Sequence, residues 1–145
     1  MARRDDGLLR QAGTIPWRRD AVGELEVLLV TTRRRGRWTL PKGDVPRSLD
    51  PRDAALREAR EEAGVSGVVG ALLGSFARRK EGRGCIVELY PMRVVAVHRA
   101  WPEQAERRRE WMPVGEAVRR VSPEAACALI ELLAARLDRA MAASR

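Results

Sequence analysis

The stretch DPRDAALREAREEAGV, residues 50–65, has the features of a complete helix with both of its ends. Asp50 is a typical N-cap residue, and Pro51 suits the first helical position because that position needs no N–H donor. Gly64 marks the end of the helix, because glycine readily adopts the left-handed conformation that closes one. We therefore predict a helix from Pro51 to about Ala63.

Three acidic side chains crowd one side of this predicted helix. At about 100° per residue, Glu58, Glu61 and Glu62 fall within an arc of roughly 100°. Like charges at this spacing destabilise an isolated helix by about 0.2–0.5 kcal/mol for each pair. Carboxylate oxygens are the ligands that Mg²⁺ prefers, together with waters and substrate phosphates, and a cation removes the repulsion. We therefore predict a divalent-metal site; taken alone, the stretch fits an exposed helix with Glu and Arg at ion-pair spacing equally well.

Length and composition favour a single globular domain spanning residues 1–145. A chain of this length buries a core without disulfides, and Cys85 and Cys127 have no neighbouring Cys or His to suggest a zinc site. We expect both cysteines to be buried apolar residues. The first 13 residues contain no secretory signal, and no segment approaches the roughly 20 apolar residues of a membrane span. We expect a cytoplasmic protein that does not bind membranes, either a monomer or a homodimer.

The positive charge of the chain points to an anionic ligand. The net charge is +8, and all but two of the 28 basic residues are arginine. An arginine cluster lies in TTRRRGRWTLPKG, residues 31–43, directly before the acidic helix. Guanidinium groups match phosphate oxygens in a bidentate manner. Nucleic acid is possible but not favoured, because the few aromatic residues form no series for base stacking within a basic stripe. A solvated loop is the alternative for this cluster and for the basic run at residues 107–109.

The remaining pattern predicts strands and helices in mixed order. We expect strands at 11–19, 24–32, 38–40, 68–80 and 85–99, a short strand followed by a short helix within 111–121, and a long helix opened by Ser122, Pro123 and Glu124. The segment between residue 33 and the acidic helix is rich in Gly and Pro and is expected to be mainly loop. This order favours an α/β fold in which helices cover both sides of a sheet.

From Gly43 to Val65 the chain resembles the Nudix box. That pattern is Gly, five residues, Glu, seven residues, Arg-Glu, an aliphatic residue, any residue, Glu-Glu, any residue, Gly and an aliphatic residue. The matching positions are Gly43, Arg57, Glu58, Glu61, Glu62, Gly64 and Val65, with Ala59 in place of the first aliphatic residue. The chain departs from the pattern at Leu49, which stands where the first Glu belongs. Asp50 is a candidate to replace that Glu.

The resemblance extends to one branch of the Nudix hydrolases. Residues 31–43 are similar to the segment that precedes the box in diphosphoinositol polyphosphate phosphohydrolases: Arg33, Arg37 and Trp38 match, and Lys42 departs from the first Gly of a Pro-Gly-Gly turn. RREWMPVGEAVRRV, residues 108–121, resembles the Arg-Glu-Trp element of the same enzymes. Related sequences also cleave dinucleoside polyphosphates.

The resemblance implies a Nudix-type α/β/α sandwich with a mixed central sheet and a metal-dependent hydrolase. The implied reaction is attack of water on phosphorus in a diphosphate linkage, with Mg²⁺ or possibly Mn²⁺. The implied metal ligands are Glu58, Glu61, Glu62 and the carbonyl of Gly43, and the catalytic set is Glu61 as base with Glu58 and Arg57. Arg57 would tie the helix to the preceding loop. The implied phosphate-binding residues are Arg33, Arg37 and Lys42, with Arg18 or Arg19 at the end of the first strand.

The implied substrate is a phosphate-rich small molecule, either a diphosphoinositol polyphosphate or a diadenosine polyphosphate. Two enzymatic alternatives are an RNA 5′-pyrophosphohydrolase and a nucleoside triphosphate pyrophosphatase. A third alternative is a non-catalytic nucleic-acid or nucleotide-binding module on the same fold, for which Leu49 is the best support.

Overall fold

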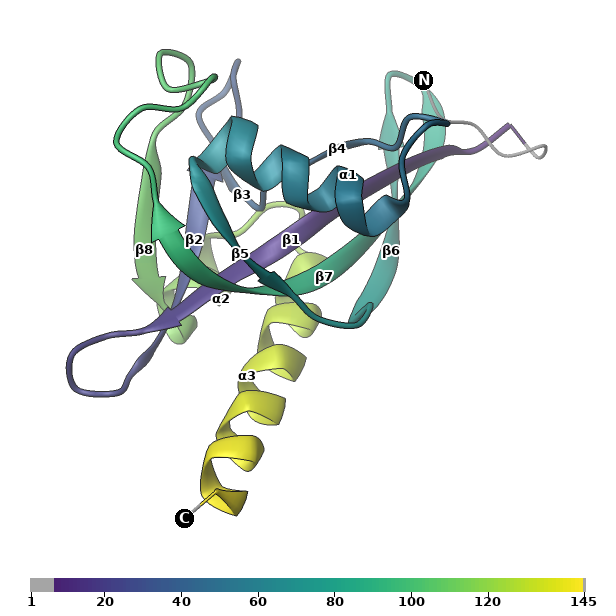
Figure 1. Ribbon diagram of the computed structural model, residues 1–145. Helices are drawn as coiled ribbons and strands as arrows, with labels where there is room; N and C mark the ends of the chain where they lie inside the picture. Colours follow the sequence, from purple (N-terminus) through teal and green to yellow (C-terminus); the bar gives the residue numbers. More distant parts are fainter. Residues whose placement is uncertain (1–6, 145) are drawn as a thin grey trace.

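A computed structural model of the protein describes residues 7–144 and shows a mixed eight-stranded sheet with helices on both faces (Figure 1). The strands are β1 (Leu9–Arg19), β2 (Leu25–Thr31), β3 (Trp38–Thr39), β4 (Lys42–Asp44), β5 (Val65–Val69), β6 (Gly74–Lys80), β7 (Arg83–Val97) and β8 (Arg109–Pro113). The helices are α1 (Pro51–Glu58), the π-helix η1 (Ala59–Ala63), α2 (Val114–Arg120) and α3 (Ala126–Ala143). No helix among the described residues is long and apolar enough to cross a membrane.

The two long strands β1 and β7 form the parallel centre of the sheet. They pair from Leu9 and Cys85 to Trp17 and Arg93, and all other pairs are antiparallel. β2 pairs with β1 at residues 17–19, whereas β4 pairs with β1 at residues 11–13, so β2 and β4 occupy successive stretches of one edge. The expectation of a mixed central sheet is confirmed.

The core has a layer on each face of the sheet, and β2 contributes to both. Leu28 and Val30 pack with Ala59 and Ala63 of η1, whereas Val27 and Leu29 pack in the cluster that includes Ile130 of α3. Successive side chains of a strand point to opposite faces, so an uninterrupted apolar strand is what a sheet covered on both sides requires. Figure 1 shows α1 on one face of the sheet and α3 on the other. The α/β/α arrangement is therefore confirmed.

The predicted helix over 51–63 is present, but its second half has a different geometry. The Asp50 side chain accepts a hydrogen bond from the Arg52 N–H at 2.8 Å, and Gly64 closes the helix with φ 65°. From Ala59 to Ala63 the helix is a π-helix, whose i→i+5 hydrogen bonds widen the turn. This change of pitch rotates Glu61 and Glu62 away from the positions that a regular helix gives them.

Other elements differ from the sequence-based expectation. The segment 68–80 contains two strands, because β5 and β6 pair with different halves of β7. β4 was not expected, and the last helix begins at Ala126 and has no side-chain cap from Ser122. Cys85 is buried as expected, whereas Cys127 is only half-buried. The single-domain expectation covers residues 1–6 and 145, which lie outside the described residues, and stays a prediction.

Candidate active site

The loop that contains β4 packs directly against the acidic helix. A Cβ atom at Gly43 would lie 2.6 Å from both carboxylate oxygens of Glu58, so a side chain at this position would displace the Glu58 carboxylate. The backbone N–H of Lys42 donates to Glu62 Oε1 at 3.2 Å. Gly43 and Glu58, which are 15 positions apart in the sequence, are thus brought into contact as the box predicts.

Glu62 is a buried carboxylate with a cationic partner. Its Oε2 lies 3.3 Å from Nη2 of Arg107. Burial raises the pKa of Glu62 to about 8; the cation of Arg107 opposes this shift, and the nearby carboxylate of Glu58 adds to it. The pKa of Glu58 is also raised, first by burial and then by the charge of Glu61. Two close carboxylates with raised pKa values form a set of oxygen donors whose charge a divalent cation would neutralise.

Glu61 does not join this pair in the structure. Its side chain is 38% exposed, and its Oε1 lies 3.9 Å from Nε of Arg57. Within residues 7–144, no three Asp, Glu, His or Cys side chains converge closely enough to form a complete metal site. In this structure Glu61 faces Arg57, and the shared role of Glu58, Glu61 and Glu62 as metal ligands stays a prediction.

Arg57 does not pair with the preceding loop, and Asp50 acts as the predicted N-cap of the helix. The ion pair of Arg57 is with Glu61 of the same helix, and the Asp50 carboxylate caps the helix through the Arg52 N–H. Leu49 packs against an apolar cluster that includes Val45 and Tyr90. The loop is tied to the helix by the bond between Lys42 and Glu62, so an ion pair with Arg57 is not what holds it.

Residues 98–109 donate hydrogen bonds to the backbone carbonyls at the C-terminal end of η1. The last carbonyls of a helix lack partners within the helix and need donors from elsewhere. Trp101 Nε1 donates to Glu62 O at 3.1 Å, the Glu103 N–H donates to Glu61 O at 3.0 Å, and Arg109 Nη1 donates to Ala63 O at 3.0 Å. Sequence reasoning missed Trp101 and Glu103, since these contacts join segments about 40 residues apart and no local pattern marks them.

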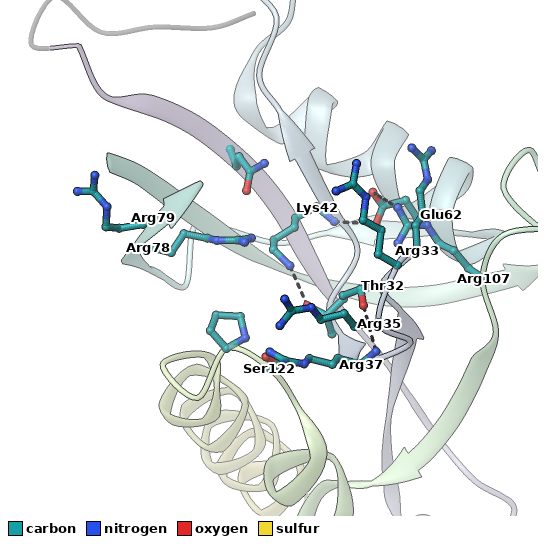
Figure 2. Close-up of a pocket in the computed structure, with 14 residues that line it drawn as sticks. Thr32, Arg33, Arg35, Arg37, Lys42, Glu62, Arg78, Arg79, Arg107 and Ser122 are labelled. Atoms are coloured by element: carbon teal, nitrogen blue, oxygen red, sulfur yellow. Dashed lines mark hydrogen bonds and ion pairs between the residues drawn. The ribbon is translucent and has the colours of Figure 1, made fainter. Parts of the chain in front are cut away.

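A cavity of about 640 Å³ opens beside Glu62, which is within the usual size range of small-molecule sites (Figure 2). Its lining has eight cationic side chains and a single carboxylate. The lining residues are Gln11, Thr32, Arg33, Arg34, Arg35, Arg37, Thr39, Lys42, Glu62, Arg78, Arg79, Arg107, Ser122 and Pro123. The structure therefore brings the predicted Arg33, Arg37 and Lys42 together, and it adds Arg78 and Arg79 from β6.

Two of these cations are already neutralised by carboxylates. Arg33 pairs with Glu103 at 3.0 Å and with Glu106 at 3.2 Å. Arg107 pairs with Glu103 at 2.7 Å as well as with Glu62. The other six have no carboxylate within 4.0 Å in the described part of the chain. Burial, followed by the nearby charge of Arg78, lowers the pKa of Lys42 to about 8.

Arg18 and Arg19 do not reach this cavity. Arg18 Nε donates to Glu26 Oε1 at 2.9 Å, and its guanidinium lies 4.0 Å from the centre of the Trp111 ring. Arg19 donates to the carbonyl of Gly23 at 3.0 Å. Both residues lie at the end of β1 that pairs with β2, whereas the cavity borders the end that pairs with β4. We therefore exclude Arg18 from the candidate site.

The three arginines at residues 107–109 have different surroundings. Arg107 lines the cavity, whereas Arg109 stacks over Trp101 at 3.8 Å and donates to His98 O at 2.8 Å. Arg108 lies over the Trp38 ring at 5.4 Å. Only one of the three arginines is therefore placed to contact a ligand in this cavity.

Comparisons with known proteins agree with this geometry. The family model of the NUDIX domain matches residues 9–133. The chain is 34% identical over 119 residues to Nudix hydrolase 21, chloroplastic, of Arabidopsis thaliana, covering 77% of this chain and 59% of that protein. It is 34% identical over 117 residues to diphosphoinositol polyphosphate phosphohydrolase 3-beta of Bos taurus, covering 79% of this chain and 70% of that protein.

Solved structures show the same fold. The Ap4A hydrolase of C. elegans in a binary complex has a TM-score of 0.74 at 21% identity, covering 90% of this chain and 98% of that chain. The NUDIX domain of Shewanella oneidensis NrtR, complexed with ADP ribose, has a TM-score of 0.72 at 20% identity, covering 90% and 89%. The box, the fold and the family match lead to one conclusion: the chain belongs to the Nudix hydrolase family.

Proposed function

We propose that this protein hydrolyses a diphosphate linkage in a phosphate-rich small molecule, such as a diphosphoinositol polyphosphate or a diadenosine polyphosphate. The observation that carries the proposal is a cavity with eight cationic side chains beside the Glu58 and Glu62 pair. The match to a relative named as a diphosphoinositol polyphosphate phosphohydrolase supports it. We further propose that the chain acts as a single cytoplasmic domain, either a monomer or a homodimer.

The glutamates are the proposed ligands of Mg²⁺ or Mn²⁺. Glu58, Glu61 and Glu62 would hold the cation with the carbonyl of Gly43, and Glu61 is close enough to Glu58 to raise its pKa. The cation would neutralise phosphate charge and lower the pKa of a bound water. Glu61, whose side chain is 38% exposed, is the proposed base that takes the proton of the attacking water on a carboxylate oxygen. Arg33, Arg37 and Lys42 would bind phosphate oxygens.

The lining of the cavity favours a phosphate-rich ligand over single-stranded nucleic acid. No aromatic side chain is among the lining residues. Trp38 and Trp111 pack against the core, so neither offers a free face for base stacking. Leu49, which replaces the first Glu of the box, is only weak support for a non-catalytic module. The hydrogen bond from the Lys42 N–H to Glu62 connects β4 to the helix without that Glu.

A substrate panel with Mg²⁺ tests the proposal. The panel contains a diphosphoinositol polyphosphate, diadenosine tetraphosphate, ATP and a 5′-triphosphorylated RNA, and released phosphate or pyrophosphate is measured. We expect turnover of at least one of the first two, and a loss of about 10²–10⁴-fold in Glu61→Gln because a general base is removed. Glu131→Gln, an exposed position on α3, is the matched control and should leave the rate unchanged.

Two outcomes would contradict the proposal. Fast hydrolysis of ATP or RNA with none of the phosphate-dense substrates would overturn the substrate class. Binding without metal-dependent turnover of any substrate, unaffected by Glu61→Gln, would instead favour a binding module.

A further inference from the structure

The cations of the cavity differ in whether their charge is balanced. Next to the glutamates, Arg33 pairs with Glu103 and Glu106, and Arg107 pairs with Glu62 and Glu103. At the β6 side, Arg78 and Arg79 have no carboxylate within 4.0 Å among residues 7–144, and neither does Lys42. Arg34, Arg35 and Arg37, in the loop between β2 and β3, are without a carboxylate partner in the described part of the chain as well. The uncompensated positive charge of the cavity therefore lies on the β6 side and on this loop.

Strand register places the side chain of Lys42 on that side. Lys42 pairs with Gly13 in the sheet and Asp44 pairs with Gln11, so the side chains of Lys42, Asp44 and Gln11 share one face. Lys42 Nζ donates to Thr39 Oγ1 at 2.8 Å, whereas only its backbone N–H contacts Glu62. Figure 2 shows Arg78 extending from β6 toward the Lys42 side chain, while Arg107 and Glu62 lie at the other side of the cavity.

Gln11 leaves one polar atom without a partner on the same face of the sheet, among the described residues. Its side chain lines the cavity and is 4% exposed, and its Nε2 donates to Asp44 Oδ1 at 3.1 Å, which fixes the orientation of the amide. Its Oε1 has no hydrogen-bond donor in the described part of the protein. Buried acceptors in native proteins are normally satisfied, and an ionised phosphate oxygen has no hydrogen to donate, so an ordered water or a ligand hydroxyl would supply the donor to Gln11.

We propose that Arg78, together with Lys42, forms a second phosphate subsite that binds a phosphate group of the substrate other than the one attacked. The inference rests on the proposed function, because the glutamates define where the attacked phosphate lies. The substrate must then carry at least two separated phosphate positions, one beside Glu58 and Glu62 and one at Arg78. Arg78 would be a specificity-determining residue, because it would select substrates by their additional phosphates.

Binding without turnover tests this subsite separately from catalysis. The probe is inositol hexakisphosphate, and its Kd is measured by isothermal titration calorimetry in EDTA. The proteins compared are the wild type, Arg78→Ala and Arg93→Ala. Arg93 is an exposed residue of β7 that does not line the cavity, so its replacement removes the same charge elsewhere. We expect Arg78→Ala to weaken binding about tenfold or more, as the loss of a charge-assisted contact does, and Arg93→Ala to change it less than about twofold.

A comparison of kcat/KM between two substrates distinguishes phosphate binding by Arg78 from a purely structural role, which would affect both substrates equally. With Mg²⁺, Arg78→Ala should lower kcat/KM about tenfold for a diphosphoinositol polyphosphate, and it should leave kcat/KM for a diphosphate substrate without further phosphates within about twofold. Arg78→Lys should recover part of the loss, because it keeps the charge but not the bidentate fork.

The outcomes separate the two proposals. Equal effects of Arg78→Ala and Arg93→Ala in both assays would overturn the subsite even if the enzyme is active. Tight probe binding that depends on Arg78, without hydrolysis of any substrate, would support the anion site while the proposed catalytic function fails.

Discussion

The glutamate pair Glu58 and Glu62 and the arginine-lined cavity lie side by side, but their charges are balanced in different ways. Glu62 is buried and held by Lys42 and Arg107, so its position is fixed by partners within the protein. Six of the eight cations of the cavity have no carboxylate partner in the described part of the chain. The comparison indicates that the acidic side has a geometry set by partners within the protein, whereas the basic side carries unpaired charge that an anionic ligand could neutralise.

Gly43→Ala gives the largest expected effect and tests the acidic side. The added Cβ would lie 2.6 Å from both carboxylate oxygens of Glu58, so Glu58 must leave its place. We expect kcat to fall about 10²-fold or more, because misplacement of a metal-binding group by about 1 Å is enough for such a loss. Phosphate release with Mg²⁺ measures it.

Gly115→Ala is the matched control for this substitution. A Cβ at Gly115 meets only the far end of Arg119, at 3.7 Å, and Gly115 lies on α2 outside the cavity. Its activity should equal that of the wild-type protein. An active Gly43→Ala variant would show that Glu58 does not need its contact with the loop.

An intermediate effect concerns the pH dependence of stability. The pKa of Glu62 in the folded, metal-free protein is about 8, raised from 4.5. The folded state therefore holds a proton that the unfolded state releases, so this residue lowers the free energy of unfolding as the pH rises from about 4.5 to about 8. In EDTA, the Tm of the wild-type protein should fall across this window more steeply than that of Glu62→Gln, by several degrees in differential scanning calorimetry.

Mg²⁺ provides the complementary measurement. A cation that binds the folded state stabilises it by mass action, and its effect should be greatest at the upper end of this window. Parallel Tm curves for the wild-type protein and Glu62→Gln, with no response to Mg²⁺, would contradict the assignment of Glu62 to the metal site.

Arg18→Ala gives the smallest expected effect. It tests whether the substrate-binding surface extends beyond the cavity to Arg18. Arg18 interacts with Glu26 and with the Trp111 ring, so its loss should cost about 0.5–1 kcal/mol of stability, as exposed pairs of this kind do. KM for the phosphate-rich substrate should stay within about twofold of the wild-type value. A tenfold rise in KM, with unfolding by urea unchanged, would return Arg18 to the substrate site.

Local features of the chain allowed much of the fold to be predicted. The helix ends at Asp50 and Gly64 were correct because capping depends on the residues next to each end. The local pattern predicts a single strand over residues 68–80, because each half is compatible with extended structure. Its division follows from pairing with different parts of β7, which no local pattern reveals.

The site was predictable in its acidic half and in part of its basic half. The contact between Gly43 and Glu58 and the lining positions of Arg33, Arg37 and Lys42 follow from the box and the segment before it. The pairing of Glu61 with Arg57 was not predictable, because no local pattern marks the π-helical turn, whose carbonyls accept hydrogen bonds from residues 98–109. Arg78 was missed for a related reason, since β6 reaches the cavity only through its pairing with β7.

The sequence by itself determined the family, the acidic helix with its caps and the abundance of positive charge, because each of these depends on residues close together in the chain. Only the tertiary structure decided which glutamates meet, that Arg18 lies outside the cavity and that Arg78 lies inside it. The physical reason is that ion pairing, burial and the pKa shifts they cause depend on distances between segments, and those distances are set by the packing of the whole sheet.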